Sequence, residues 1–334
     1  MSTLQERRYF SGFARVWTPV LASSQFGSAP VAATVAGERL VFFRGAAGAA
    51  ALLDRCPHRG VALSLGRVRD GCLECPFHGW RFDEAGAARF VPWNPDARTE
   101  LLGAVSLPVA EAGGLVWLYT APGRDAPPLP PVARALARRA RSVVKEQLVA
   151  THWSRVIENV LDAPHLPFVH RWTIGAAARA PADAGARMET SYTPTDDGGR
   201  VRWSVDGATT GPNQGWIRHH APNLMALGDG DDGGPPEQLV VAVPVDATRT
   251  RSLAVLAPGL SLFRVLDALL GDRLNREDRH VIETHDPPEV PRVGETSVRT
   301  DRATLAFRRY YDRALRDSYA TLPTGPTTED APGP

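Results

Sequence analysis

The sequence predicts an α+β protein, with an all-β N-terminal half followed by a larger half in which a curved antiparallel sheet packs on long helices. Three observations support this prediction. Residues 26–121 contain short β-rich runs punctuated by glycine. Residues 122–133 are rich in proline and have no means of packing a core. Residues 134–320 combine strand-like runs with long helical patterns.

The N-terminal half is expected to be a small antiparallel sandwich or barrel, because its strand-like runs are short and closely spaced. Residues 1–25 are expected to be an N-terminal helical segment, residues 26–121 the first domain, and residues 122–133 a linker. The runs that predict strands cover residues 31–36, 40–44, 51–54, 105–109 and 115–119.

The second domain is expected to span residues 134–320. The tail, residues 321–334, is rich in Pro, Thr and Asp and is expected to be disordered. Helical patterns cover residues 151–161, 262–283 and 303–319, and strand-like runs cover residues 201–205, 215–219, 238–245 and 252–257.

Composition excludes several classes of protein. The chain has 38 basic and 37 acidic residues, and this balance argues against nucleic acid or an anionic membrane as the main partner. No apolar run approaches the roughly 18 residues needed to span a bilayer. The opening segment has paired arginines, but Arg15 and Pro19 interrupt the apolar stretch that an export signal requires. The expectation is a cytoplasmic protein without a membrane partner.

The three cysteines, Cys56, Cys72 and Cys75, all fall in one short segment. An odd, local set is a poor disulfide framework and favours a metal site in a reducing compartment. Two of the three form close pairs with histidine, in C-P-H at residues 56–58 and C-P-F-H-G-W at residues 75–80.

This donor set predicts a 2Fe–2S cluster. Two thiolates, from Cys56 and Cys75, suit one iron, and two imidazoles, from His58 and His78, suit the other. Replacing two anionic thiolates by neutral imidazoles raises the reduction potential of the cluster. The alternative is a structural zinc site, in which the Cys72-x-x-Cys75 pair would join a histidine. That alternative would leave one of the four residues without a role.

A second donor set lies between residues 158 and 170. On a continuous helix Glu158, Asp162 and His165 would share one face. His170 could not join His165 there without a break, and Pro164 and Pro167 supply one. Two histidines and a carboxylate form the facial triad that binds Fe(II) and leaves positions open for O2 and substrate.

The two motifs together resemble the Rieske non-heme iron oxygenases, over about residues 9 to 315. The resemblance implies a Rieske domain followed by a helix-grip-like catalytic domain. The C-P-H form of the first loop and the segment 301–311 look most like the single-subunit monooxygenases and demethylases and the pheophorbide a oxygenase branch.

The resemblance also implies roles for residues of the second motif. His165 and His170 would be ligands of the mononuclear iron. Asn159 and Asp162 match positions retained in the family motif. Asp162 would form an acidic bridge to a cluster histidine, matching His78, of a neighbouring subunit.

The third iron ligand is implied only by the family pattern, which places a carboxylate late in the catalytic domain, often in an E-D-x-x-x-x-E helix. Residues 276–283 fit this pattern, and Asp278 takes the ligand position. Glu277, Glu283 and Asp286 remain alternatives, and a solvated charged helix face is the other interpretation of the run.

By resemblance the chain is the terminal oxygenase component, which oxidises a small, largely apolar substrate with O2 by hydroxylation or demethylation. Monooxygenation is favoured over ring dioxygenation. Electrons would pass from the cluster, by way of Asp162, to the iron. No nucleotide-binding fingerprint is present, so NAD(P)H would act through a separate reductase, with or without a ferredoxin. The family also implies a head-to-tail homotrimer.

Two other function classes stay open at this point. A Rieske-type electron-transfer protein would need only the first half of the chain and would leave residues 159–170 unexplained. A ligand-binding protein with an inactive iron site would be favoured if the late carboxylate were absent.

Overall fold

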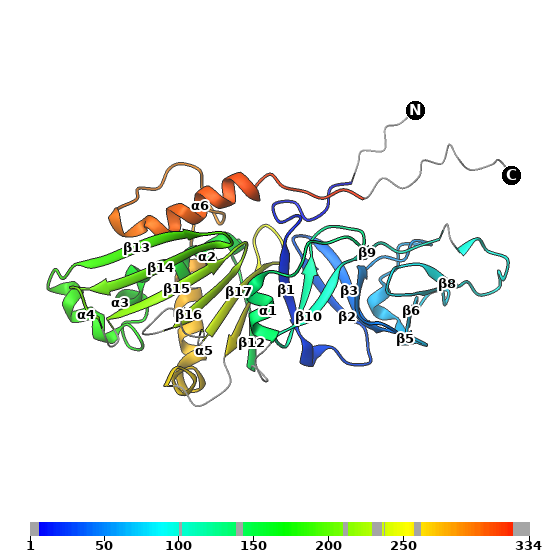
Figure 1. Ribbon diagram of the computed structural model, residues 1–334, viewed down its shortest axis with the longest axis horizontal. Helices are drawn as coiled ribbons and strands as arrows, with labels where there is room; N and C mark the ends of the chain where they lie inside the picture. Colours follow the sequence, from blue (N-terminus) through cyan, green and yellow to red (C-terminus); the bar gives the residue numbers. More distant parts are fainter. Residues whose placement is uncertain are drawn as a thin grey trace.

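The computed structural model describes residues 7–99, 102–137, 143–209, 213–228, 236, 238–256 and 262–322. Within these ranges the strands form four sheets in which all pairings are antiparallel. The molecule is elongated, with three small sheets in one half and a seven-stranded sheet with the long helices in the other (Figure 1). This arrangement confirms the predicted α+β class.

The N-terminal half holds the three small sheets. The expected strand at 105–109 is split at Pro108, which lacks the N–H that a continuous ladder needs. In sheet order the strands are β1 (Trp17–Ala22), β11 (Leu115–Tyr119) and β10 (Val109–Ala112); β2 (Val31–Val35), β3 (Glu38–Gly45), β4 (Gly48–Leu53) and β9 (Ser106–Leu107); and β5 (Arg67–Arg69), β6 (Cys72–Glu74), β7 (Arg81–Phe82) and β8 (Ala88–Phe90).

The expected helical segment at residues 1–25 is wrong for the residues described. The chain there forms β1, followed by a short 3-10 turn at Ser23–Gln25. The strand pairs with β11 from Trp17 opposite Tyr119, and its last five residues are buried. Burial between paired strands therefore decides the conformation of this segment.

The second half contains the seven-stranded sheet, with three strands that the sequence pattern did not predict: β12, β13 and β16. Its strands in order are β12 (Val143–Val149), β18 (Thr250–Leu256), β17 (Gln238–Pro244), β16 (Leu224–Gly228), β15 (Gln214–His220), β14 (Gly198–Val205) and β13 (Met188–Thr195). The helices are α1 (Pro131–Ala137), α2 (Trp153–Leu161), α3 (Leu166–Val169), α4 (Ala176–Asp183), α5 (Leu262–Ile282) and α6 (Arg302–Ala314).

Two predicted boundaries shift. Helix α1 begins at Pro131, inside the expected linker, because proline is favoured at the first helical position. Helix α6 ends at Ala314, before the expected residue 319. Residues 323–334 of the expected disordered tail lie outside the described residues.

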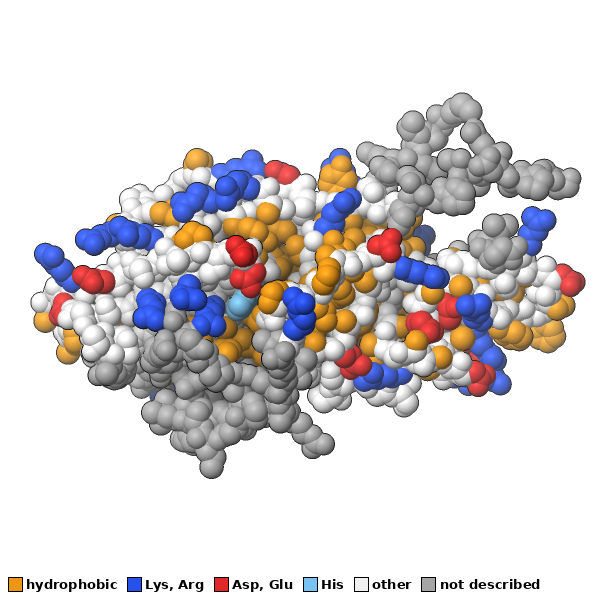
Figure 2. Space-filling model, in the orientation of Figure 1, with side chains coloured by type: hydrophobic (Ala, Val, Ile, Leu, Met, Phe, Trp, Pro, Cys, Tyr) orange, Lys and Arg blue, Asp and Glu red, His pale blue; other side chains and the backbone are white. Residues whose placement is uncertain are grey.

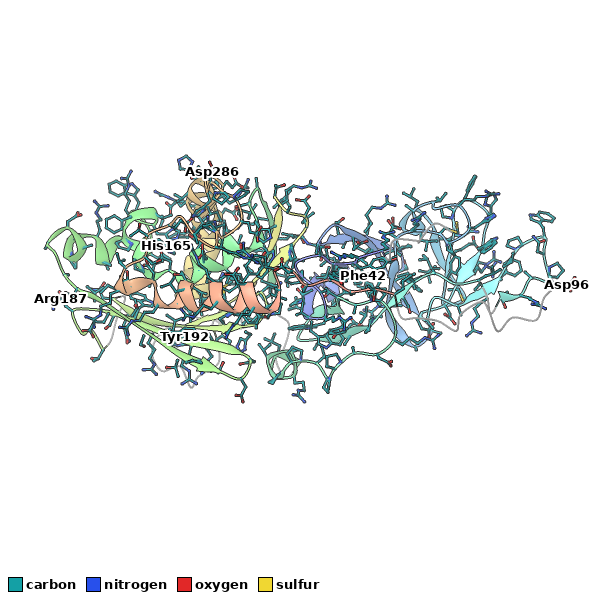
Figure 3. The ribbon with its side chains drawn as sticks, turned by 90° about the horizontal axis from the view of Figure 1, so that it is seen from above. Phe42, Asp96, His165, Arg187, Tyr192 and Asp286 are labelled. Atoms are coloured by element: carbon teal, nitrogen blue, oxygen red, sulfur yellow. The ribbon has the colours of Figure 1, made fainter. Side chains whose placement is uncertain are left out.

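The long helices cover one face of the large sheet, as the view from above shows (Figure 3). Trp153 of α2 is 1% exposed and packs edge-on against Phe307 and Tyr311 of α6. Basic side chains gather on the opposite face over β13 to β15 (Figure 2). Arg200 and Arg202 of β14 are exposed. The helix-covered face is thus where a buried site can form.

The two halves are joined by direct hydrogen bonds. The N–H groups of Ala36 and Gly37, in the turn between β2 and β3, donate to the carbonyl oxygens of Pro244 and Val245 at 2.8 Å each. The Asn223 side chain donates to Thr18 Oγ1 at 2.9 Å. Within the described ranges, no helix combines the length and apolar character that crossing a membrane requires.

Candidate metal centres

The two cysteine-histidine loops share one backbone design. Cys56 follows β4 and Cys75 follows β6. In each loop the glycine four residues after the cysteine donates its N–H to the cysteine carbonyl, at 2.8 Å for Gly60 and 3.0 Å for Gly79. Both glycines have positive φ, 74° and 71°, which favours glycine over other residues. Each loop therefore closes tightly and presents one cysteine and one histidine.

The donor atoms of these loops fit the predicted cluster. Cys56 and Cys75 are each 2% exposed, and the rings of His58 and His78 lie 4.8 Å apart. Burial raises the pKa of Cys56 to about 11, and the neighbouring Cys75 thiol contributes to the rise, which shows that the two thiols lie close together. The Nδ1 atom of His58 is buried without a hydrogen-bond partner, so a donor atom is left over for a metal.

The zinc alternative does not fit this geometry. The donor atoms of one tetrahedral zinc site lie within about 4 Å of one another. Among the described residues, three donor atoms within 4.8 Å of one another occur in one place only, and none of the cysteines takes part. Cys72 begins strand β6 and lies opposite Arg69 of β5. The loops thus offer a thiol pair and an imidazole pair, as a two-iron cluster requires.

An aromatic hollow surrounds the two loop histidines. Its volume is ≈ 310 Å³. Trp93 beside it is 97% exposed and Phe77 is 59% exposed. The aromatic side chains beside the two histidines are therefore accessible at the surface of the molecule. The lining residues are His58, Phe77, His78, Trp80, Pro92, Trp93 and Asn94.

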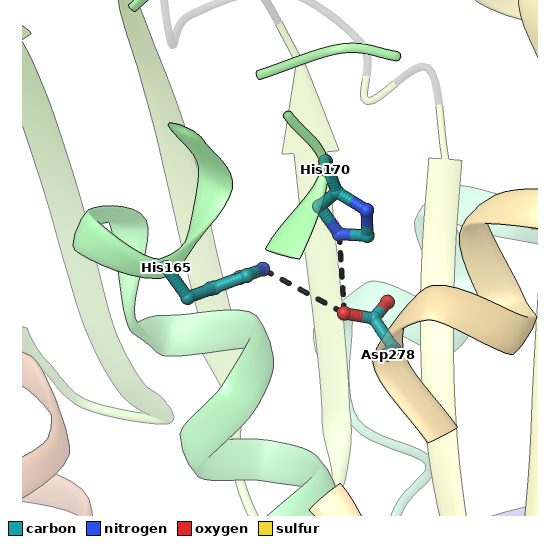
Figure 4. Close-up of side chains that lie close together, drawn as sticks. All are labelled: His165, His170 and Asp278. Carbon is teal, nitrogen blue, oxygen red and sulfur yellow. Dashed lines mark ion pairs between the residues drawn. The ribbon is translucent and has the colours of Figure 1, made fainter. Parts of the chain in front are cut away.

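The second centre lies in the other half of the molecule and joins two segments far apart in sequence. His165, His170 and Asp278 each place one donor atom within 4.8 Å of the others (Figure 4). Asp278 Oδ1 lies 3.7 Å from His165 Nε2 and 3.1 Å from His170 Nε2. The structure therefore brings together the three residues that were expected to bind the mononuclear iron. This set of two imidazoles and one carboxylate suits Fe(II).

The local path of the chain corrects one expectation. Glu158, Asp162 and His165 do not share a continuous helix face, because α2 ends at Leu161 and Asp162 caps it with φ −94° and ψ 89°. A 3-10 turn at Ala163–His165 and the short α3 follow. Pro164 has no N–H to continue the α-helical ladder, which explains the break.

Asp278 is contacted by Asn159 of α2 as well as by the two histidines. Asn159 of α2 donates its Nδ2–H to Asp278 Oδ1 at 3.0 Å, so one carboxylate oxygen faces the amide and both imidazoles. Burial alone would raise the pKa of Asp278, but the hydrogen bond and charge of His170 outweigh it and lower the pKa below its ordinary value. The carboxylate is therefore ionised at neutral pH, as a metal ligand must be.

The two histidines differ in their second partners. His165 Nδ1 contacts the backbone carbonyl of Asp162, and burial lowers the pKa of His165. His170 Nδ1 lies 3.0 Å from Glu277 Oε2. Burial alone would lower the pKa of His170, but the carboxylates of Asp278 and Glu277 raise it.

The three alternative carboxylates lie outside this group. Glu277 faces the far nitrogen of His170, and Glu283 accepts the Ala150 N–H and pairs with Arg279. Asp286 is exposed beyond the end of α5. Asp278 is thus the carboxylate that shares the site with the two histidines.

Asp162 lies at the edge of the centre. Its carboxylate Oδ2 is 4.0 Å from His165 Nδ1, and its side chain is 34% exposed. Burial raises the pKa of Asp162 to about 6, with further contributions from Asp301 and Glu158. The carboxylate therefore stands between the buried histidine and the surface.

A buried ion network behind α2 was not predicted. Arg155 is 1% exposed and donates to Glu158 at 3.0 Å and to Glu295 at 2.8 Å. Arg308 of α6 also contacts both carboxylates. The network fixes α2, which carries Asn159 and Asp162, to α6. The signal was an arginine three residues before a glutamate within a largely apolar helix.

The remaining histidines make contacts away from the triad. His152 caps α2 and accepts from the Ser154 N–H, and His219 Nε2 lies 3.1 Å from the Pro222 carbonyl. His220 pairs with Asp197 at 2.8 Å. His280 is exposed on α5, and His285 contacts the Ile282 carbonyl at 2.9 Å.

Comparisons with known proteins match each half of the chain separately. Residues 16–104 match the family described as the Rieske [2Fe-2S] domain. Residues 149–226 match the vanillate O-demethylase oxygenase C-terminal domain. The first match covers both cysteine-histidine loops, and the second covers His165 and His170.

Individual relatives support the same grouping. The chain is 28% identical to methylxanthine N1-demethylase NdmA of Pseudomonas putida, over 94% of this chain and 91% of that protein. It is 35% identical to the 3-chlorobenzoate-3,4-dioxygenase oxygenase subunit of Comamonas testosteroni, over 46% of this chain and only 37% of that relative. A crystal structure of dicamba monooxygenase bound to dicamba has the same fold, with a TM-score of 0.74, 21% identity and coverage of 92% of this chain and 98% of that chain.

Proposed function

Because the chain belongs to the Rieske non-heme iron oxygenases, we propose that it is a terminal oxygenase that uses O2 and externally supplied electrons to oxidise a small, largely apolar organic substrate. The observation that carries the proposal is the group of His165, His170 and Asp278, whose donor atoms lie within 4.8 Å of one another. Neither an electron-transfer protein nor a ligand-binding protein has a need for this group.

The residues of each centre suit a distinct iron group. Cys56, His58, Cys75 and His78 would hold the 2Fe–2S cluster, and His165, His170 and Asp278 would hold Fe(II). When bound, the cluster stores one electron and the mononuclear iron activates O2. The protein's part is to orient the imidazoles. The His165 Nδ1 contact and the His170 Nδ1 contact turn both Nε2 atoms toward Asp278 Oδ1.

Monooxygenation, by hydroxylation or demethylation, is the reaction type that we propose. Support comes from the match to the vanillate O-demethylase domain and from relatives named as demethylases of methylxanthine and dicamba. We propose that a separate reductase, with or without a ferredoxin, supplies electrons from NAD(P)H. We also propose a cytoplasmic location, because the three cysteines are unpaired and cluster ligands must stay reduced.

Iron and acid-labile sulfide analysis of anaerobically purified protein tests the proposal. The expected content is about three irons and two sulfides per chain, with a Rieske-type electron paramagnetic resonance (EPR) signal after dithionite reduction. Two irons with the same signal would contradict an oxygenase and favour electron transfer or ligand binding. Zinc without sulfide would contradict the cluster as well.

We further propose that the working unit is a homotrimer in which the cluster of one subunit serves the iron site of the next. In one chain, His165 lies in the half opposite Asp96, which follows the Trp93–Asn94 wall of the cluster hollow (Figure 3). The hollow with Trp93, 97% exposed, is a surface that a second copy would cover. A head-to-tail contact of this kind closes into a ring.

Mixed assemblies of two inactive variants test the trimer. A His78→Ala chain lacks a cluster ligand and a His170→Ala chain lacks an iron ligand. If the cluster of one subunit serves the next, co-expressing the two variants is expected to restore part of the substrate oxidation that neither shows alone. If both centres of one chain work together, the mixture stays inactive. The mass of each assembly by sedimentation shows whether three chains are present.

A further inference from the structure

Both ring nitrogens of His170 are contacted by consecutive residues of α5. Nδ1 lies 3.0 Å from Glu277 Oε2, and Nε2 lies 3.1 Å from Asp278 Oδ1. The His170 side chain is 3% exposed, so water has little access to either nitrogen. Neighbouring residues on a helix point about 100° apart, and the flat imidazole spans that gap.

Glu277 is itself held in place by two further donors. Thr173 Oγ1 donates to Glu277 Oε2 at 3.0 Å, and Arg273 Nε donates to Glu277 Oε1 at 2.9 Å. The Glu277 side chain is 18% exposed. With both oxygens engaged, the carboxylate keeps a fixed direction toward His170.

The other histidine of the site has a different partner at its Nδ1 atom. There His165 contacts the neutral backbone carbonyl of Asp162, and the Asp162 carboxylate lies farther off, with Oδ2 at 4.0 Å. A carboxylate behind a ligand histidine fixes its tautomer and raises the basicity of the nitrogen that faces the metal. The two imidazoles are therefore unequal, and His170 is the stronger donor.

We propose that Glu277 is a positioning residue of the iron site, which accepts the Nδ1–H of His170 and keeps the Nε2 lone pair directed toward the side of Asp278. This inference rests on the proposed function, since it assumes that His165, His170 and Asp278 hold a divalent metal. Glu277 would orient the ligand His170 without binding the metal itself. Thr173 and Arg273 would contribute by holding the Glu277 carboxylate in place.

The test is the affinity of the mononuclear site for Co(II) in the full-length protein with its cluster intact. After chelation of the resident metal, Co(II) is titrated against a fluorescent chelator. Glu277→Gln keeps the size of the side chain and removes its charge, and it is expected to weaken Co(II) binding by about 10- to 100-fold. Thr173→Val, which removes one donor to Glu277, is expected to weaken binding to a smaller degree. An altered Co(II) EPR signal in Glu277→Gln would show that the ligand field has changed.

Glu283→Gln is the matched control. Glu283 directly follows Ile282, the last residue of α5. It pairs with the arginine four residues before it at 3.0 Å, as Glu277 does at 2.9 Å. It contacts neither histidine of the site, so its removal is expected to leave Co(II) affinity within about twofold of the wild type. Circular dichroism of all variants checks that they fold.

The outcomes distinguish failure of the role proposed for Glu277 from failure of the proposed function. If the wild type binds Co(II), Asp278→Asn does not, and Glu277→Gln binds within about twofold of the wild type, the role of Glu277 is overturned and the proposed function stands. If the wild type binds no Co(II), both are overturned. Equal weakening in Glu277→Gln and Glu283→Gln would mean a general effect of charge on α5, which also overturns the role of Glu277.

Discussion

Replacement of His170 by alanine is expected to abolish substrate oxidation while leaving the visible spectrum of the 2Fe–2S cluster unchanged. The change removes one of three donors around the proposed iron, at a ring nitrogen 3.1 Å from Asp278 Oδ1. Loss of an outer partner of a ligand costs roughly 10- to 100-fold in metal affinity, so loss of the ligand itself costs more. Iron content should fall from about three to two per chain. His165→Ala is expected to behave in the same way.

His280→Ala is the control for this prediction. His280 is on the same helix as Asp278 but is exposed, and its removal should change neither iron content nor turnover. The cluster spectrum is expected to stay unchanged in His170→Ala, because the cluster loops lie in the other half of the molecule (Figure 1). Turnover at the wild-type rate in His170→Ala, or a lost cluster spectrum, would contradict the division into two centres.

The cluster loops could be predicted from sequence because their donors are local. Each loop carries its cysteine, its histidine and the glycine that closes it within a few residues, so residue type and spacing define the site. His165 and His170 were predictable for the same reason. The short helix α3 lies between them, with His165 at its N-cap and His170 at its C-cap, and the two ring centroids are 5.3 Å apart.

The roles of Glu277 and Asp278 could not be separated by local pattern. Both residues are acidic and they are consecutive in the sequence. Which carboxylate faces Nε2 of His170 and which faces Nδ1 depends on how α5 is rotated about its axis relative to His170. Family resemblance favoured Asp278, and the structure places its Oδ1 atom beside Nε2 of both histidines. The second partner of each histidine likewise depends on tertiary packing.

The missed strand β13 is explained by its place in the sheet. In β13 (Met188–Thr195) all residues are half-buried or exposed, since it is the edge strand of the large sheet. Its residues therefore show no apolar alternation that would predict a strand. The wrongly predicted N-terminal helix is the opposite case, in which pairing of Trp17–Ala22 with β11 sets the conformation.

Replacement of Asp162 by asparagine is expected to lower turnover by about 100-fold or more while both metal groups stay bound. The backbone carbonyl of Asp162, not its carboxylate, contacts His165 Nδ1, so the substitution leaves that contact in place. The carboxylate is 4.0 Å from the same nitrogen and 34% exposed, a position from which it can also reach a group outside the chain. In the proposed trimer that group is the cluster histidine matching His78 of the next subunit. Misplacement of reacting partners by about 1 Å costs on the order of 100-fold in rate.

The experiment compares Asp162→Asn with Asp301→Asn in single-turnover reactions of the dithionite-reduced protein. Asp301 is a charged neighbour of Asp162 that contributes to its raised pKa. It stands at the N-cap position of α6 without a side-chain capping hydrogen bond, so Asp301→Asn tests the effect of local charge. The expected result for Asp162→Asn is full iron and sulfide content, normal reduction by dithionite and little product. Asp301→Asn should form product at close to the wild-type rate. A fully active Asp162→Asn protein would mean that the outward carboxylate has no part in linking the two centres. Asp162 would then contribute to the iron site only through its backbone carbonyl, which contacts His165 Nδ1.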